Sequence, residues 1–226
     1  MAKGKLLVLM FILSLSSCGT AIKTLAGFKN PKVEDKKELS IYFATVFPNE
    51  PTYFMNVKEK GNQEEIINNI LLGMNYKLLL FKATGEKYCY LGTDECGGIQ
   101  MQNAFKNFDQ NYAPCKEDNG LSMNTYLSII CDLSGKSIEK EALPKADYYI
   151  FQNWNKYSGS RKKLQEDINW LLDLKKNSDL NVAIIFINGD MLEEWGLEKN
   201  GELPLKFKKE GKEFTMTFGE LPLKNK

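Results

Sequence analysis

The chain of 226 residues contains no histidine. Histidine is the commonest general base near neutral pH and the commonest metal ligand in proteins. Its absence excludes hydrolases built on Ser-His or Cys-His pairs, and it excludes zinc sites with histidine ligands. Any chemistry that this chain performs must therefore come from carboxylates, thiols, amines, hydroxyls or the backbone.

The sequence also lacks an excess of charge of either sign. Lys and Arg number 30 against 29 Asp and Glu, which gives a formal net charge of +1, and the basic residues are spread along the chain. Nucleic-acid binding needs a concentrated basic stripe, so no nucleic acid is expected as a partner. With 43% hydrophobic and 26% charged residues, most of the chain is expected to fold as a globular protein.

The amino-terminal residues combine the parts of a secretory signal peptide. Lys3 and Lys5 precede an apolar run at 6–13, and small residues then lead to Cys18. This run is too short to span the hydrocarbon core of a bilayer, which is about 30 Å thick. Residues 1–17 are therefore expected to be an export signal that is removed, and not a transmembrane helix.

The tetrapeptide Leu15-Ser16-Ser17-Cys18 resembles the lipobox of bacterial lipoproteins. The resemblance implies attachment of diacylglycerol to the Cys18 sulfur, cleavage before Cys18 and N-acylation of the new terminus. Two or three acyl chains, at about 0.8 kcal/mol per buried methylene, would anchor the chain nearly permanently, with 18–33 as the lipidated tether. The alternative is an ordinary secreted protein with an unmodified cysteine.

Localisation follows from the same resemblance. Gly19 and Thr20 follow Cys18, where some bacteria read an Asp as the signal for retention in the inner membrane. The chain is therefore expected in the cell envelope, held at the outer membrane by its lipid anchor, and another envelope protein is its candidate partner.

Four cysteines remain after Cys18, an even number in a chain expected to enter an oxidising compartment. Spacing alone leaves open the pairing among Cys89, Cys96, Cys115 and Cys131. Helical apolar spacing at 122–133 favours a small buried residue at Cys131. No metal site is expected, because the six residues between Cys89 and Cys96 exceed the two to four that zinc knuckles favour.

Cys96 is the cysteine with the most open role. It could form a disulfide with Cys89 or Cys115, remain an inert thiol, or serve as a reactive thiolate. A position near the start of a helix that runs through 101–108 would favour the thiolate, because unpaired N–H groups stabilise negative charge there. The neighbouring Asp94 and Glu95 would disfavour it.

The apolar pattern predicts alternating helices and strands in one domain at 34–226, because no low-complexity tract or charge block marks a boundary. In the first half, the pattern predicts helices at 34–47 and 63–73, a short strand at 52–57, and a hairpin at 76–90 that turns around Thr84-Gly85.

The last third predicts two parallel strands joined by a helix. The strands are expected at 148–153 and 182–188, and the helix at 160–176 with Ser160 as its cap. The second strand is an almost continuous apolar run, which is typical of a strand covered on both faces of an α/β sheet.

This order of elements, with Trp154 at the corner before the helix and Leu203-Pro204 ahead of a final hairpin, resembles the thioredoxin fold. The resemblance covers residues from 147 onward and implies a three-layer α/β fold, with a mixed central sheet flanked by helices. It also makes Pro204 the candidate cis residue. The hairpin at 76–90 resembles the family's hairpin too, so a rearranged or tandem arrangement is open.

The corner departs from the family's redox motif. The two redox cysteines of the family would fall near Asn155 and Ser158, and neither residue can form or exchange a disulfide. The resemblance therefore implies a thioredoxin-like domain that is redox-inactive at this corner.

The leading hypothesis is a lipid-anchored cell-envelope protein whose redox-inactive domain has a binding or envelope-assembly role. Trp154, Tyr157 and Trp195 are candidate binding residues if exposed and core residues if buried, and Pro204 is a further ligand-binding candidate. No cofactor is expected beyond the covalent diacylglycerol and N-acyl chain on Cys18.

Two enzyme hypotheses stand beside it. The first is a thiol-dependent oxidoreductase or peroxidase-like enzyme that uses Cys96. The second is carboxylate-based hydrolysis by Asp94 with Glu95, or by Asp190 with Glu193 and Glu194, although no motif fixes the separation of these groups.

Overall fold

The computed structural model describes residues 28–57, 67, 78–92, 105–115, 122–210 and 213–224. The expected signal peptide, Cys18 and Cys96 with its acidic neighbours lie outside these residues. The expected helix at 63–73 also lies outside them apart from Ile67, which is helical and buried. None of the described helices is long and apolar enough to cross a membrane.

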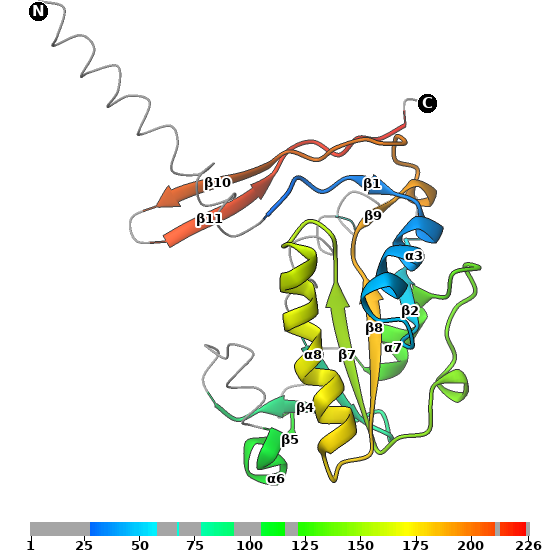
Figure 1. The fold of residues 1–226 in the computed structure, drawn as a ribbon, viewed down its shortest axis with the longest axis vertical. Helices are drawn as coiled ribbons and strands as arrows, with labels where there is room; N and C mark the ends of the chain where they lie inside the picture. Colours follow the sequence, from blue (N-terminus) through cyan, green and yellow to red (C-terminus); the bar gives the residue numbers. More distant parts are fainter. Residues whose placement is uncertain are drawn as a thin grey trace, which may run out of the picture. The chain divides into compact units, whose positions relative to one another are not determined.

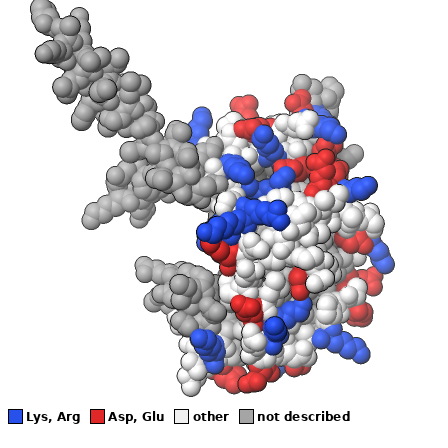
Figure 2. Space-filling view, in the orientation of Figure 1, with Lys and Arg blue, Asp and Glu red and all other residues white. Residues whose placement is uncertain are grey.

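The chain forms two compact units. The first comprises Met1–Glu34, Lys156–Ser160 and Asp190–Lys226, and the second comprises Asp35–Asn155 and Arg161–Gly189. Each unit is assembled from segments that are far apart in the sequence. Figure 2 shows that basic and acidic side chains are interspersed over the drawn face, as the near-zero net charge leads one to expect.

The second unit is built on a seven-stranded mixed sheet in the order β5-β4-β3-β7-β8-β2-β6 (Figure 1). Strand β8 pairs in parallel with both β7 and β2, and the remaining neighbours are antiparallel. The expected mixed α/β architecture is confirmed at this level. The strands span Thr52–Met55 (β2), Leu78–Lys82 (β3), Lys87–Tyr90 (β4), Tyr112–Pro114 (β5), Ile130–Cys131 (β6), Tyr148–Trp154 (β7) and Val182–Asn188 (β8).

Helices cover both faces of this sheet. Along β7, the ring of Phe151 lies 5.2 Å from that of Tyr126 in helix α7 (Met123–Ser128), whereas Trp154 lies 4.7 Å from Phe43 in helix α3 (Lys36–Val46). Successive side chains of a strand point to opposite faces, so two residues three positions apart lie on different faces. The helices α7 and α3 therefore pack on opposite sides of the sheet.

The strand-helix-strand unit of the last third is confirmed. Strand β7, helix α8 (Arg161–Asn177) and strand β8 follow one another, and the two strands pair in register from Tyr148↔Val182 to Trp154↔Asn188. All seven residues of β8 are buried, as its continuous apolar sequence predicts for a strand covered on both faces. Figure 1 shows α8 running along the two strands.

The predicted helix at the start of the second unit is confirmed as α3. The Asp35 carboxylate accepts a hydrogen bond from the Glu38 N–H at 3.0 Å, which satisfies one of the unpaired donors at the helix start. Leu39 and Phe43 are buried at helical spacing, and the Phe43 ring also lies 5.3 Å from Phe186 of β8. This helix therefore closes the core over the central strand.

The predicted hairpin is confirmed as β3 and β4. Gly85 adopts a φ of 94°, which only glycine reaches without strain, and the Lys82 N–H donates to the Glu86 carbonyl at 2.8 Å. Strand β3 pairs with β7, so the large sheet takes its hairpin from the first half of the chain. Beyond it, a disulfide joins Cys89 of β4 to Cys115, which directly follows β5.

The helix expected at 122–133 is shorter than its apolar spacing predicts. Helix α7 ends at Ser128, and Ile130 and Cys131 form β6, which pairs with Phe54 and Met55 of β2. The two residues are buried, and pairing with an otherwise open sheet edge outweighs local helical preference. Cys131 is buried, as its apolar surroundings in the sequence indicated.

The short helices of the described chain are α6 (Phe108–Asn111) and two 3-10 turns, Lys140–Ala142 and Glu193–Trp195. The helix expected through 101–108 is described from residue 105 onward, where Phe105 and Phe108 are buried as its apolar stripe predicts.

The first unit contains two separate two-stranded sheets. Strand β1 (Val33–Glu34) pairs in parallel with β9 (Met191–Leu192), and β10 (Leu205–Glu210) forms an antiparallel hairpin with β11 (Glu213–Phe218). Of the two hairpins that the resemblance offered to the large sheet, this terminal one forms a sheet of its own. Residues 28–31 engage the hairpin instead, since the Leu205 N–H donates to the Asn30 side chain at 3.0 Å and Phe28 packs 5.5 Å from Phe207.

The prediction that Pro204 has a cis peptide bond is wrong. No cis peptide bond occurs in the part of the chain that the structure describes, so Pro204 is trans. The Leu203 N–H donates to the Pro31 carbonyl at 2.8 Å, and the Pro204 carbonyl accepts from the Gly219 N–H at 2.9 Å. These bonds hold the proline in the hairpin of the first unit.

Truncation of Phe43 should destabilise the second unit, whereas truncation of a neighbour on the exposed face of α3 should not. The Phe43→Ala variant loses the contacts with Trp154 and Phe186 and should lower the free energy of unfolding by about 3–5 kcal/mol. The matched control Ile41→Ala removes a side chain that is 57% exposed and should change it by about 0.5 kcal/mol or less. Urea unfolding followed by circular dichroism measures both, and equal losses would contradict the assignment of the core face.

Candidate functional site

The corner after β7 begins with Trp154, which is not an exposed binding residue. It is 2% exposed, and its Nε1 donates to Thr52 Oγ1 at 2.8 Å. Its ring stacks on Phe43 and, at 6.2 Å, on Tyr42. Asn155, at one of the two positions where the resemblance placed a redox cysteine, is buried beside it in the sequence. Trp154 therefore has the core role that the sequence left as the alternative.

The other two aromatic candidates are core residues of the first unit. Tyr157 and Trp195 are each 2% exposed, and the Tyr157 ring lies 6.4 Å from Phe218 in an edge-on arrangement. Ser158, at the second redox position, is half-buried. Pro204 is exposed, and its ring lies so close to Gly219 that a Cβ at residue 219 would stand 3.1 Å from Pro204 Cδ.

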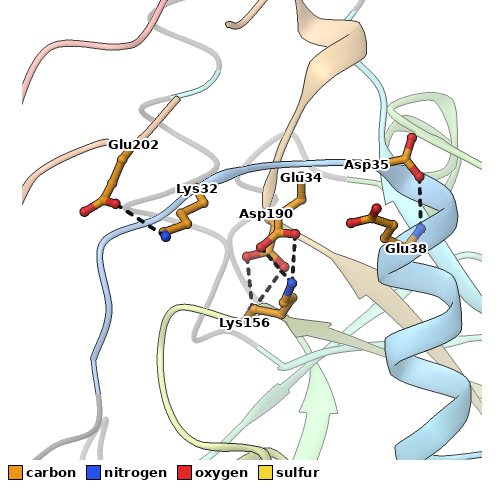
Figure 3. Close-up of polar contacts among 7 residues, drawn as sticks. All are labelled: Lys32, Glu34, Asp35, Glu38, Lys156, Asp190 and Glu202. Carbon is orange, nitrogen blue, oxygen red and sulfur yellow. Dashed lines mark hydrogen bonds and ion pairs between the residues drawn. The ribbon is translucent and has the colours of Figure 1, made fainter. Parts of the chain in front are cut away.

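A polar cluster occupies the first unit where its three segments meet. Both carboxylate oxygens of Asp190 accept from the Lys156 backbone N–H at 3.0 Å, and Lys156 Nζ lies 2.8 Å from the Glu34 carboxylate. Figure 3 shows Lys156 between the two acidic side chains. Asp190 is 1% exposed, so its charge is stabilised by hydrogen bonds and not by water.

A cavity of about 240 Å³ adjoins this cluster. Besides the three clustered residues, it is lined by Tyr157, Asn30 and the amines of Lys29 and Lys32. Lys32 makes an exposed ion pair with Glu202 at 3.7 Å, also drawn in Figure 3. The cavity is smaller than the roughly 300 Å³ at which ligand pockets usually begin.

The chemistry of the cluster is that of a structural clamp. It contains carboxylates, an amine and a phenol, and the carboxylates already accept hydrogen bonds from Lys156. Glu193, the proposed hydrolytic companion of Asp190, is half-buried and pairs with Lys199 at 3.6 Å. No group of three or more His, Cys, Asp or Glu residues that could hold a metal ion occurs within the described ranges.

Two of the ionisable groups in the second unit whose pKa is shifted by their surroundings are Tyr126 and Asp132. Burial raises the pKa of the Tyr126 phenol, although its hydrogen bond to Asn153 Oδ1 at 3.0 Å opposes the shift. The Ser134 hydroxyl and the Lys136 N–H lower the pKa of the Asp132 carboxyl. Tyr126 therefore stays neutral as a hydrogen-bond donor in the core, and Asp132 stays ionised in its turn.

Sequence reasoning singled out Asp190 but missed Glu34 and Lys156. Lys156 and Asp190 each lie two residues after a parallel strand, and the ends of those strands are paired as Trp154↔Asn188. Residues that follow the carboxyl ends of adjacent parallel strands come together in α/β folds, which is the signal that could have joined these two. Glu34 carries no such local signal.

Loss of the Asp190 carboxylate should loosen the corner. Asp190→Ala leaves the Lys156 N–H without its acceptor and should cost about 1–3 kcal/mol, with faster hydrogen exchange of that amide. Asp190→Asn keeps one acceptor oxygen and should cost less. The comparison variant Lys156→Ala removes the side-chain pair with Glu34 but keeps the backbone N–H and its acceptor, so the exchange of that amide should stay slow. Unchanged exchange at Lys156 in Asp190→Ala would contradict the clamp.

Compared with protein-family models, with curated proteins and with solved structures, the chain matches none. Its function must therefore be argued from its own residues and geometry.

Proposed function

We propose that the chain is a lipid-anchored protein of the bacterial cell envelope with a binding or envelope-assembly role. The observation that carries the proposal is the tetrapeptide ending at Cys18, preceded by a charged and apolar signal. A diacylated and N-acylated Cys18 holds the protein at the membrane, and the two folded units act next to the outer membrane on an envelope partner.

The second unit is in this proposal a rearranged thioredoxin-like module. The support is the unit β7-α8-β8 with Trp154 at its corner, together with the use of the hairpin β3-β4 as the antiparallel part of the same sheet. The hairpin β3-β4 precedes β7 in the sequence. It occupies the sheet position beside β7 that the thioredoxin fold gives to a hairpin after the strand-helix-strand unit. That use of the earlier hairpin favours a rearranged arrangement over a tandem one.

The module is redox-inactive at its corner. Asn155 and Ser158 stand where the resemblance places the redox pair, and Trp154 beside them is committed to the core. The Cys131 thiol is buried, with Lys36 Nζ at 3.3 Å from its sulfur. Cys89 and Cys115 form a disulfide with each other. Binding is thus better supported than thiol chemistry by the described residues.

The anchor makes a direct prediction. A Cys18→Ser variant of the full chain should move from the membrane fraction to the soluble fraction, because its acyl chains are lost. The matched control Cys96→Ser should stay in the membrane fraction. Intact mass of the membrane-extracted protein measures the acyl chains directly, and a membrane-bound Cys18→Ser variant would overturn the lipid anchor.

One observation favours the second candidate, a thiol-dependent oxidoreductase or peroxidase-like enzyme that uses Cys96. Cys89 and Cys115, the two expected disulfide partners of Cys96, are bonded to each other. A cysteine without a disulfide in an oxidising compartment is either an inert or a reactive thiol.

Alkylation before and after reduction separates these two thiol roles. On the binding proposal, Cys96 should alkylate slowly at mildly acidic pH, because an ordinary thiol has a pKa near 8.5 and is protonated there. Peptide mapping should release Cys89 and Cys115 only after reduction. Fast alkylation of Cys96 alone at that pH would make the enzyme the leading function.

A further inference from the structure

A hollow with an aromatic wall lies in the second unit between the 105–109 segment and the carboxyl-terminal half of α8. Its volume is about 450 Å³, which is within the range of small-molecule sites. Aromatic and acidic side chains line it in equal number, namely Phe105, Phe108, Trp170, Asp109, Asp173 and Asp179. We name this hollow the α8 groove.

The aromatic wall of the α8 groove is preorganised. The Phe105 ring lies 6.1 Å from Trp170 and 5.9 Å from Phe108, and the two phenylalanines are buried. Trp170 is half-buried, whereas Trp154 and Trp195, the other tryptophans of the chain, are core residues. The indole of Trp170 is therefore the partly accessible tryptophan side chain, and it lines the groove.

The groove is negatively charged. Asp109, Asp173 and Asp179 are exposed, and none of them makes an ion pair with another residue that the structure describes. Lys106 is the one basic residue among the described lining residues. The described lining thus holds three carboxylates and one amine.

Helix α8 adds to this field by its direction. Trp170, Asp173 and Asn177 lie at helical spacing on one side of α8, and the helix ends at Asn177 within the lining. The last carbonyls of a helix lack intrahelical partners and carry the negative end of its dipole. Aromatic faces, carboxylates and a helix carboxyl end all attract the same kind of group.

We propose that the α8 groove binds an organic cation, an ammonium or guanidinium group carried on an apolar body. The apolar body packs on Phe105 and Trp170, and the cation lies over the indole within reach of Asp173 and Asp179. This inference rests on the binding role proposed above and names the chemistry of its ligand.

The probe is 2-phenylethylammonium, titrated into the full chain by calorimetry. Its neutral analogue 2-phenylethanol and its anionic analogue phenylacetate share the apolar body and differ in charge. The cation should bind at least about tenfold more tightly than the anion, with the neutral probe between them, and it should change the fluorescence of Trp170. Equal affinities for the three probes, or preference for the anion, would overturn the inference.

Variants on one helix assign the binding to the groove. Asp173→Asn should weaken cation binding by about three- to tenfold and leave 2-phenylethanol unaffected, whereas Trp170→Leu should weaken both probes. The matched control is Glu166→Gln, which removes one negative charge from the same helix but pairs with Lys162 at 3.7 Å outside the lining. An equal effect of Asp173→Asn and Glu166→Gln would show nonspecific charge attraction and would also overturn it.

A second arm distinguishes the source of the cation. Tighter binding of 2-phenylethylammonium than of the capped dipeptide acetyl-Lys-Phe-amide supports a free organic amine as ligand, and the reverse supports a lysine side chain of a partner protein. The measurement is independent of the anchor. Failure of cation binding in a protein that carries acylated Cys18 defeats this inference alone, whereas cation binding by a protein without acyl chains defeats only the anchoring.

Discussion

Burial of β8 on both faces is the constraint on which the rest of the second unit depends. Six consecutive apolar residues and the Asn that ends them leave no polar face, so each side of this strand needs an apolar cover. On one side, α3 supplies Phe43 against Phe186, and on the other, the same sheet packs Phe151 against Tyr126 of α7. Parallel partners β7 and β2 complete its hydrogen bonds.

The charged residues of the two units serve different purposes. In the first unit, the buried Asp190 and the nearly buried Glu34 both bond to Lys156. These contacts join three segments that are far apart in the sequence. In the second, the carboxylates along the α8 groove remain exposed beside aromatic rings. The carboxylates of the first unit are thus satisfied within the protein, whereas those of the groove are in contact with solvent.

The periodic elements were predictable because their apolar spacing is local: α3, α8, β7 and β8 follow from residues that are neighbours in the sequence. The failures are all long-range. Ile130 and Cys131 have helical apolar spacing but pair with β2. The hairpin of β10 and β11 forms a sheet of its own, which residues 28–31 contact. The candidate groove draws on positions 105 to 180, which no contiguous motif could have connected.

The disulfide between Cys89 and Cys115 gives the end of the sheet a property that strand pairing alone does not. It converts residues 89–115 into a covalent ring whose two ends are fixed by β4 and β5, and Cys96 lies on that ring. A peptide bond broken by a protease anywhere in the ring would leave both ends attached to the folded unit. A single cut on either side of Cys96 therefore leaves both fragments joined for as long as the disulfide is intact.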